Sequence, residues 1–143
     1  MKVIKKFNIK LVASLFCLFT STVTLADVSV IVNAANGATI SEGDIPRIFL
    51  GKVKQFTNGD KITIINMKFK QATRNEFEEK VLNKSASQVK AYWSKLMFSG
   101  KGKPPKELAS DKDIIAFVSS NPSAIAYIDA ASADGSVKVI KTF

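Results

Sequence analysis

The sequence has 143 residues, a formal net charge of +9, no histidine and one cysteine, Cys17. The missing histidine excludes a Ser-His-Asp triad, a Cys-His pair and a histidine-ligated metal site, and a lone cysteine excludes an internal disulfide or an iron–sulfur cluster. We therefore expect no metal, no other cofactor and no enzyme, although lysine, tyrosine and carboxylate chemistry stays open.

The N-terminal segment has the three parts of a secretory signal. Lysines among the first ten residues give a positive region, residues 11–19 form a short apolar core, and Ala26 is the small residue expected before a cleavage site. The apolar run is too short to span a bilayer, and Phe16 before Cys17 does not fit a lipoprotein signal. We expect residues 1–26 to be a cleaved signal peptide and residues 27–143 to be one soluble periplasmic domain, without stable membrane insertion.

Removal of the signal lowers the formal net charge from +9 to +5, because the signal holds four lysines and no acidic residue. A moderate positive charge suits an anionic ligand, an acidic partner or an anionic surface, and solubility alone is the simpler explanation. The basic residues are scattered and no aromatic residues alternate with them, so we expect no nucleic-acid partner.

The first predicted elements are a strand at residues 28–33 and, after a loop of small residues, a short helix that ends at Gly51. The inner face of this helix is formed by Ile45, Ile48 and Phe49. Either Ser41 or Asp44 is its cap, and the second choice places Pro46 in the first turn, where proline is tolerated.

A polar loop with a turn at Asn58-Gly59 leads to a second strand at residues 62–66. A helix over residues 72–82 follows, with Phe77 and Val81 on its inner face. We expect its glutamates to lie largely on the outer side and to take no part in general acid–base catalysis, with one of them paired to Lys80. These glutamates are Glu76, Glu78 and Glu79.

Residues 85–99 form the most regular predicted helix. Ser85 and Gln88 have the spacing of a capping box, and Gly100 is a typical helix end. Its apolar residues recur every three or four positions, which makes one continuous stripe; they are Val89, Tyr92, Trp93, Leu96 and Met97. The Tyr-Trp pair suits either the core or a ligand platform, and we favour the core because aliphatic residues share its face.

A basic loop over residues 99–106 precedes a fourth helix, capped by Ser110 and stopped at Asn121-Pro122. Strands are expected at residues 124–128 and 137–140. The order β-α-β-α-α-α-β-β, with nearly continuous apolar strands, predicts an α/β fold in which helices cover a small sheet.

Several segments resemble the periplasmic phosphate-binding proteins of ABC transporters. Residues 40–52 are similar to the pattern "L-x-x-x-x-L-x-x-I-F-x-G-K" of that family, Ala72 to Phe77 to its "G-T-R-x-x-F", and Asn121 to Tyr127 to its "N-P-x-A-I-G-Y". Residues 92–105 are similar to its short, single-lobe members. The resemblance implies one lobe of a type II periplasmic binding protein, and with it a non-enzymatic solute-binding domain.

The family pattern for the phosphate ligands, "R-x-D/E-G-S-G-T", aligns with Met67 to Thr73. Met67 and Phe69 replace the arginine and the acidic residue, and the glycines are gone, so of these positions only Thr73 keeps a ligand type. One lobe alone also provides no hinge closure around a ligand. The departures imply weak binding of phosphate or another small anion, if any is bound.

The residues that remain for an anion site are Lys70, Gln71, Thr73 and Arg74. They cluster at a helix N-terminus, where free N–H groups and cationic side chains attract anions. In the simpler alternative, which the loss of the glycines favours, Thr73 is only the N-cap and the cations are solvated. Two hypotheses therefore stay open: a weak phosphate-type binding domain, or an adaptor that binds an envelope or transporter protein.

Overall fold

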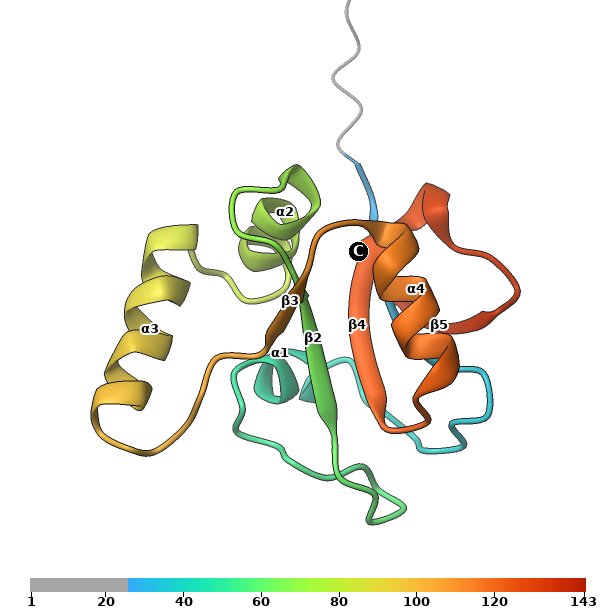
Figure 1. The fold of residues 1–143 in the computed structure, drawn as a ribbon, viewed down its shortest axis with the longest axis horizontal. Coiled ribbons are helices and arrows are strands. Elements are labelled where there is room, and N and C mark those ends of the chain that lie inside the picture. Colours follow the sequence, from blue (N-terminus) through green and yellow to red (C-terminus); the bar gives the residue numbers. More distant parts are fainter. Residues whose placement is uncertain (1–25) are drawn as a thin grey trace, which may run out of the picture.

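Figure 1 shows a computed structural model of the chain, which describes residues 26–143. Apart from Ala26, the predicted signal peptide lies outside the described residues, so its cleavage stays a prediction. Within residues 26–143 no helix is both long and apolar enough to cross a membrane.

Strands and helices are interspersed along the chain, as expected for an α/β fold. In chain order they are β1 (Val28–Asn33), α1 (Asp44–Phe49), β2 (Thr63–Met67), α2 (Ala72–Lys80), α3 (Ala86–Phe98), β3 (Lys106–Leu108), α4 (Asp111–Ser120), β4 (Ala124–Asp129) and β5 (Val137–Thr142). Every predicted helix and strand is present, and β3 is an additional strand, between the basic loop and the fourth helix, that the sequence does not predict.

The five strands form one mixed sheet in the order β3-β2-β4-β1-β5. Strand β2 runs parallel to both β3 and β4, whereas β1 is antiparallel to both β4 and β5. All six residues of β1 are buried, which explains why its sequence is apolar except for Ser29 and Asn33. The first and last strands of the domain therefore lie side by side, with β1 inside the sheet and β5 at its edge.

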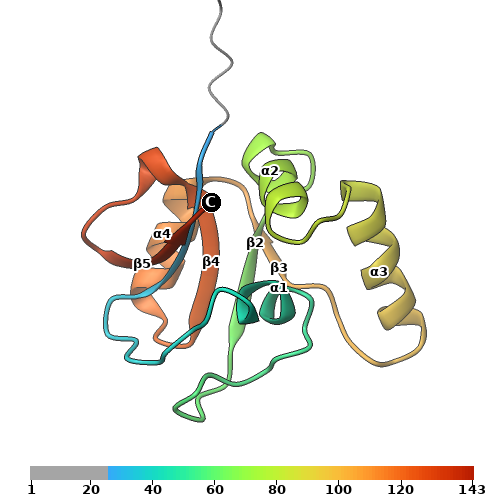
Figure 2. The ribbon, with the colours of Figure 1, turned by 180° about the vertical axis from the view of Figure 1, so that it is seen from behind.

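Helices cover both faces of this sheet. Helix α4 lies in front of the sheet in Figure 1, and α1 and α2 lie on the opposite side, as the view from behind shows (Figure 2). Helix α3 stands beside the β3 edge. The α/β class and the sheet covered by helices are thus confirmed.

An aromatic cluster joins α1 and α2 to the sheet. Phe77 of α2 stacks on Tyr127 of β4 with ring centroids 3.8 Å apart, and Phe49 of α1 meets the Phe77 ring edge-on at 4.7 Å. Such pairs add to the stability that comes from burying the rings. A hydrogen bond connects this cluster to the end of β2, just before the turn to α2: Met67 N–H donates to the Tyr127 hydroxyl oxygen (3.3 Å).

Helix α3 has the predicted capping box. Ser85 Oγ accepts from Gln88 N–H (3.2 Å), and Gln88 Oε1 accepts from Ser85 N–H (2.8 Å). Trp93 is only 7% exposed and packs against Gly51, so the expectation that it belongs to the core is confirmed. The Tyr92 hydroxyl donates to the carbonyl of Leu50 (2.6 Å), which ties α3 to the end of α1.

Candidate functional site

The β2–α2 turn, residues 68–71, carries the predicted anion site. Lys70 has a φ of 69°, in the left-handed region that favours glycine. Gln71 N–H donates to the carbonyl of Lys68 (3.3 Å), which closes the turn. Lys70 and Gln71 are exposed, and Thr73 is half-buried. Gln71 is the N-cap of α2, so the alternative in which Thr73 caps the helix is wrong.

Arg74 points into the protein rather than towards the surface of the turn. It is 5% exposed, and its Nε donates to Glu78 Oε1 at 2.7 Å. Its Nη1 donates to the carbonyl of Met67 (2.9 Å) and to Glu107 Oε1. Burial alone lowers the pKa of Arg74, but the hydrogen bonds to Glu78 and Glu107 outweigh it and raise the pKa above its ordinary value.

The expectation that Glu78 lies on the outer side of α2 is wrong, because its side chain is almost fully buried at 2% exposure. Arg74 lies one helical turn earlier on the same face, and its charge compensates the buried carboxylate. The other oxygen, Oε2, has no hydrogen-bond partner among residues 26–143. The other two glutamates lie further out: Glu76 is half-buried, 3.4 Å from Lys80, and Glu79 is exposed.

The structure thus brings Lys70, Gln71 and Thr73 together at the start of α2 and turns Arg74 away from them. Arg74 is already paired with one buried and one half-exposed carboxylate, so little of its charge reaches an anion at the surface of the turn. Lys70 is the one cationic side chain among the four predicted residues that is exposed to solvent at the turn.

A half-open pocket of about 310 Å³ lies beside this turn. Its lining residues are Phe69, Arg74, Lys90, Trp93, Ser94, Met97, Pro104 and Glu107. The Phe69 ring covers the buried cation, with the Arg74 Cζ atom 5.5 Å from the ring centroid, and Lys90 Nζ lies 5.7 Å from the same centroid. Phe69, Trp93, Met97 and Pro104 make much of this lining apolar, whereas a phosphate site requires mainly polar and cationic groups.

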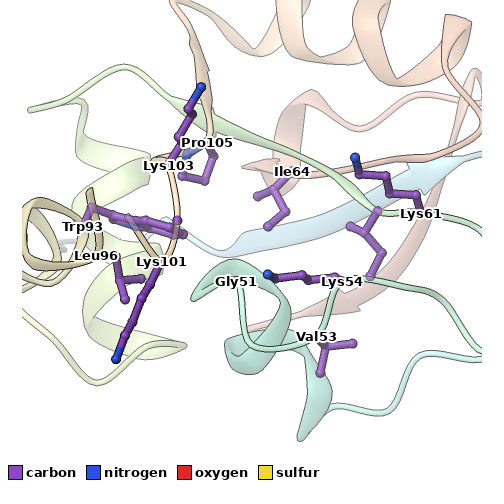
Figure 3. A pocket seen from close by; sticks show the side chains of 12 residues that line it. Gly51, Val53, Lys54, Lys61, Ile64, Trp93, Leu96, Lys101, Lys103 and Pro105 are labelled. Atoms are coloured by element: carbon purple, nitrogen blue, oxygen red, sulfur yellow. The ribbon is translucent and has the colours of Figure 1, made fainter. Parts of the chain in front are cut away.

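A second pocket, of about 410 Å³, lies at the other end of β2 (Figure 3). We call it the lysine pocket, because Lys54, Lys61, Lys101 and Lys103 are among its lining residues. Its floor and walls are mainly apolar; they are formed by Gly51, Val53, Ile62, Ile64, Trp93, Leu96, Gly102 and Pro105. Trp93 separates this pocket from the one beside the β2–α2 turn, since it lines both.

The described residues hold no cluster of three or more acidic, histidine or cysteine side chains placed to bind a metal ion. Two charged groups assembled from distant parts of the chain lie beside pockets: the group around Arg74 and the four lysines of the lysine pocket. Sequence reasoning missed both. Glu107 reaches Arg74 from the unpredicted strand β3, and the four lysines come in two pairs from segments far apart in the sequence, so no local pattern signals how either group is assembled.

Comparison with solved structures finds this fold in proteins that handle phosphate. An ABC-type phosphate transport receptor from Vibrio cholerae superposes with a TM-score of 0.63 at 21% identity, over 82% of this chain and 47% of that chain. A putative phosphate ABC transporter substrate-binding protein with bound phosphate from Clostridium perfringens gives 0.63 at 19% identity, over 82% and 46%. PstS from Borrelia burgdorferi gives 0.62 at 17%, over 81% and 47%.

The chain therefore spans about half the length of these solved structures. At identities this low, the superpositions establish the fold alone. As a resemblance in fold, the expected similarity to phosphate-binding proteins is confirmed. Comparisons with protein-family models and with curated proteins find no match.

Proposed function

We propose that this chain is an exported, non-enzymatic binding domain with the fold of a phosphate-receptor lobe, in which the β2–α2 turn binds phosphate or another small anion weakly. One observation carries the proposal. The turn keeps exposed Lys70 and Gln71 at the start of α2, while the Arg74 side chain is directed inward and paired with Glu78 and Glu107. A solute-binding domain needs no catalytic group, which agrees with the missing histidine.

Weak binding follows from the groups that remain. Backbone N–H groups at the start of a helix attract anions, and Lys70 adds one solvated charge. Solvent screens such exposed pairs, and each is worth about 1 kcal/mol or less. We expect a dissociation constant for phosphate of roughly 0.1 mM or weaker, which corresponds to about 5.5 kcal/mol or less.

Calorimetric titration of residues 27–143 with inorganic phosphate tests the proposal. Lys70→Asn removes the charge and keeps a residue that tolerates the left-handed backbone, so binding should weaken several-fold without loss of stability. Lys112→Asn, on the exposed side of α4, is the matched control and should leave binding unchanged. Micromolar or tighter binding that is insensitive to salt would show that the ligands lie elsewhere.

A second candidate function is an adaptor that binds an envelope or transporter protein. The lysine pocket and the exposed end of α3 favour it, since Met97 is 53% and Phe98 is 88% exposed. Absence of phosphate binding up to about 10 mM would leave this function as the better account of the fold.

A further inference from the structure

We propose that the lysine pocket is the docking site for an acidic, extended segment of a partner protein that places an apolar side chain in the pocket. This inference specifies the partner of the adaptor function and rests on that second candidate. The pocket lies where β2 begins, whereas the turn proposed to bind anions follows the end of β2. The two sites are therefore separate and can be tested independently.

The apolar part of the pocket suits a side chain rather than a fully polar anion. Ile62 and Trp93 are the buried residues of its lining, and Ile64, Leu96 and Pro105 are half-buried around them. Its volume of about 410 Å³ falls within the usual range of ligand pockets, about 300–1,000 Å³. Burial of an apolar side chain against these residues contributes favourable free energy that inorganic phosphate does not provide.

The charged part of the pocket is of one sign. Its lining includes four lysines and no acidic residue, and none of these lysines forms an ion pair with residues 26–143. Positive charge without internal compensation attracts an acidic partner and speeds its association. The charge of the pocket thus selects an anionic occupant.

The arrangement of the lysines favours an extended occupant. In Figure 3 the four ammonium groups are spread apart: Lys101 and Lys103 point in opposite directions, the Lys54 nitrogen lies close to Gly51, and Lys61 lies beyond Ile64. Lys54 and Lys61 come from the segment before β2. A compact anion reaches only some of these lysines, whereas a chain that carries carboxylates on both sides of an apolar residue pairs with several of them at once.

Trp93 makes the pocket accessible to a direct measurement. It is the only tryptophan in the sequence and it lines both this pocket and the one beside the β2–α2 turn, so its fluorescence reports binding at either, and the lysine variants described below assign the change. The probe is a peptide blocked at both ends, with a central leucine flanked on each side by three acidic residues. Titrated into residues 27–143, it should change the emission of Trp93 in a saturable way, with a dissociation constant below about 1 mM.

Two comparisons separate specific docking from general attraction. A peptide with serine in place of leucine should bind at least about tenfold more weakly. The variant with both Lys101→Glu and Lys103→Glu should lose binding by a similar factor, whereas Lys112→Glu with Lys138→Glu, which changes the net charge equally on exposed lysines outside the pocket, should lose much less. Binding should also fade at about 1 M salt, where the Debye length is about 3 Å.

An emission that does not change up to about 1 mM peptide overturns the inference, and so does equal loss of binding in the two double variants. Phosphate titration of the same preparations distinguishes the two proposals. Peptide binding that persists in Lys70→Asn and is lost in Lys101→Glu with Lys103→Glu assigns the effect to the lysine pocket. Weak phosphate binding that persists in Lys101→Glu with Lys103→Glu supports the turn as the anion site, whatever the outcome with the peptide.

Discussion

Arg74 shows how a residue expected to face a ligand becomes part of the interior instead. Its guanidinium is held by Glu78, Glu107 and the carbonyl of Met67, and the Phe69 ring covers it. A buried ion pair adds little stability compared with apolar side chains of the same size, but removal of one partner leaves an uncompensated charge. A large loss of stability is therefore expected when one partner is replaced alone, and only a small change when both are replaced by apolar residues.

We expect Arg74→Met to lower the free energy of unfolding by about 3–5 kcal/mol, because Glu78 is then buried without a cation. The exposed pair of Arg47 and Asp44, at 3.0 Å, provides the control: Arg47→Met should change stability by less than about 1 kcal/mol. The double variant with Arg74→Met and Glu78→Met should recover most of the loss. Denaturant unfolding measures all three, and similar losses at the two arginines would contradict this account.

Tyr127 gives the domain a dependence on alkaline pH. Desolvation by burial raises the pKa of its hydroxyl well above the ordinary value of 10.0. The hydroxyl thus stays neutral in the folded protein at a pH where it ionises in the unfolded chain, so the stability that it contributes is complete below pH 10 and is lost as the pH rises further. The loss approaches about 1.4 kcal/mol per pH unit for one group.

Tyr127→Phe should therefore flatten the fall in stability between about pH 10 and pH 11, by about 1 kcal/mol. The comparison requires unfolding curves at several pH values, since the substitution also removes the acceptor of the Met67 N–H and lowers stability at every pH by about 1 kcal/mol. A variant curve that runs parallel to that of the original protein over this range would show that Tyr127 is not the group responsible.

At the scale of the elements, the sequence predicts features that depend on neighbouring residues and misses features that depend on contacts between distant residues. Ser85 and Ser110 accept from the backbone three residues later, as their patterns predict, because a cap needs only its own helix. Strand β3 has three residues, follows Pro104-Pro105 and is half-exposed or exposed. Strand β3 forms because it pairs with β2, and its own three residues show no alternation of apolar and polar side chains that would predict a strand.

The same distinction between local and long-range contacts explains which residues of the candidate sites the sequence predicts. The β2–α2 turn and its exposed residues Lys70 and Gln71 were predicted because they are contiguous. The burial of Glu78 was not predicted, since it depends on Arg74 turning inward and on Glu107, 33 residues further along, reaching the same guanidinium. The lysine pocket likewise depends on how the segment after α1 and the segment after α3 meet at the start of β2.

Substitutions at two glycines test how tightly α3 packs against the rest of the domain. Gly51 and Gly100 follow α1 and α3 with φ of 70° and 69°, so alanine strains both backbones equally. A Cβ at Gly51 would also lie 3.1 Å from the Trp93 ring, whereas nothing lies within 4 Å at Gly100. We expect Gly100→Ala to cost about 1 kcal/mol and Gly51→Ala to cost about 1–3 kcal/mol more.

Thermal or denaturant unfolding of the two glycine variants provides the test, and Trp93 emission in the folded Gly51→Ala protein adds a local readout. The ring must shift to admit the new methyl group, so its emission should change in Gly51→Ala and stay unchanged in Gly100→Ala. Equal destabilisation with unchanged emission in both variants would mean that the Trp93 ring moves away at no cost, and the pocket wall would then be less rigid than the structure indicates.

For the whole molecule, the start of the sheet coincides with the predicted start of the exported protein. The Asp27 carbonyl accepts from Ala130 N–H (2.9 Å), and Val28 and Phe143 exchange two backbone hydrogen bonds, at 3.1 and 2.9 Å. Ala26 contributes only its carbonyl oxygen, which accepts from Lys80 Nζ (3.1 Å). Cleavage after Ala26 therefore leaves the sheet complete, while cleavage a few residues later would remove buried residues.

We expect intact-mass measurement of the periplasmic fraction to give residues 27–143, and this protein to unfold at the same denaturant concentration as a chain that keeps Ala26. A chain that begins at Ile31 lacks Val28 and Val30, which are fully buried between β4 and β5. Each buried valine contributes about 1.5–3 kcal/mol, and the paired backbone of residues 28–30 is lost with them. Such a chain should be largely unfolded, because the expected loss approaches the whole stability of a small domain, about 5–15 kcal/mol. An exported protein that begins within β1 and still folds would contradict both the cleavage site and the central place of β1 in the sheet.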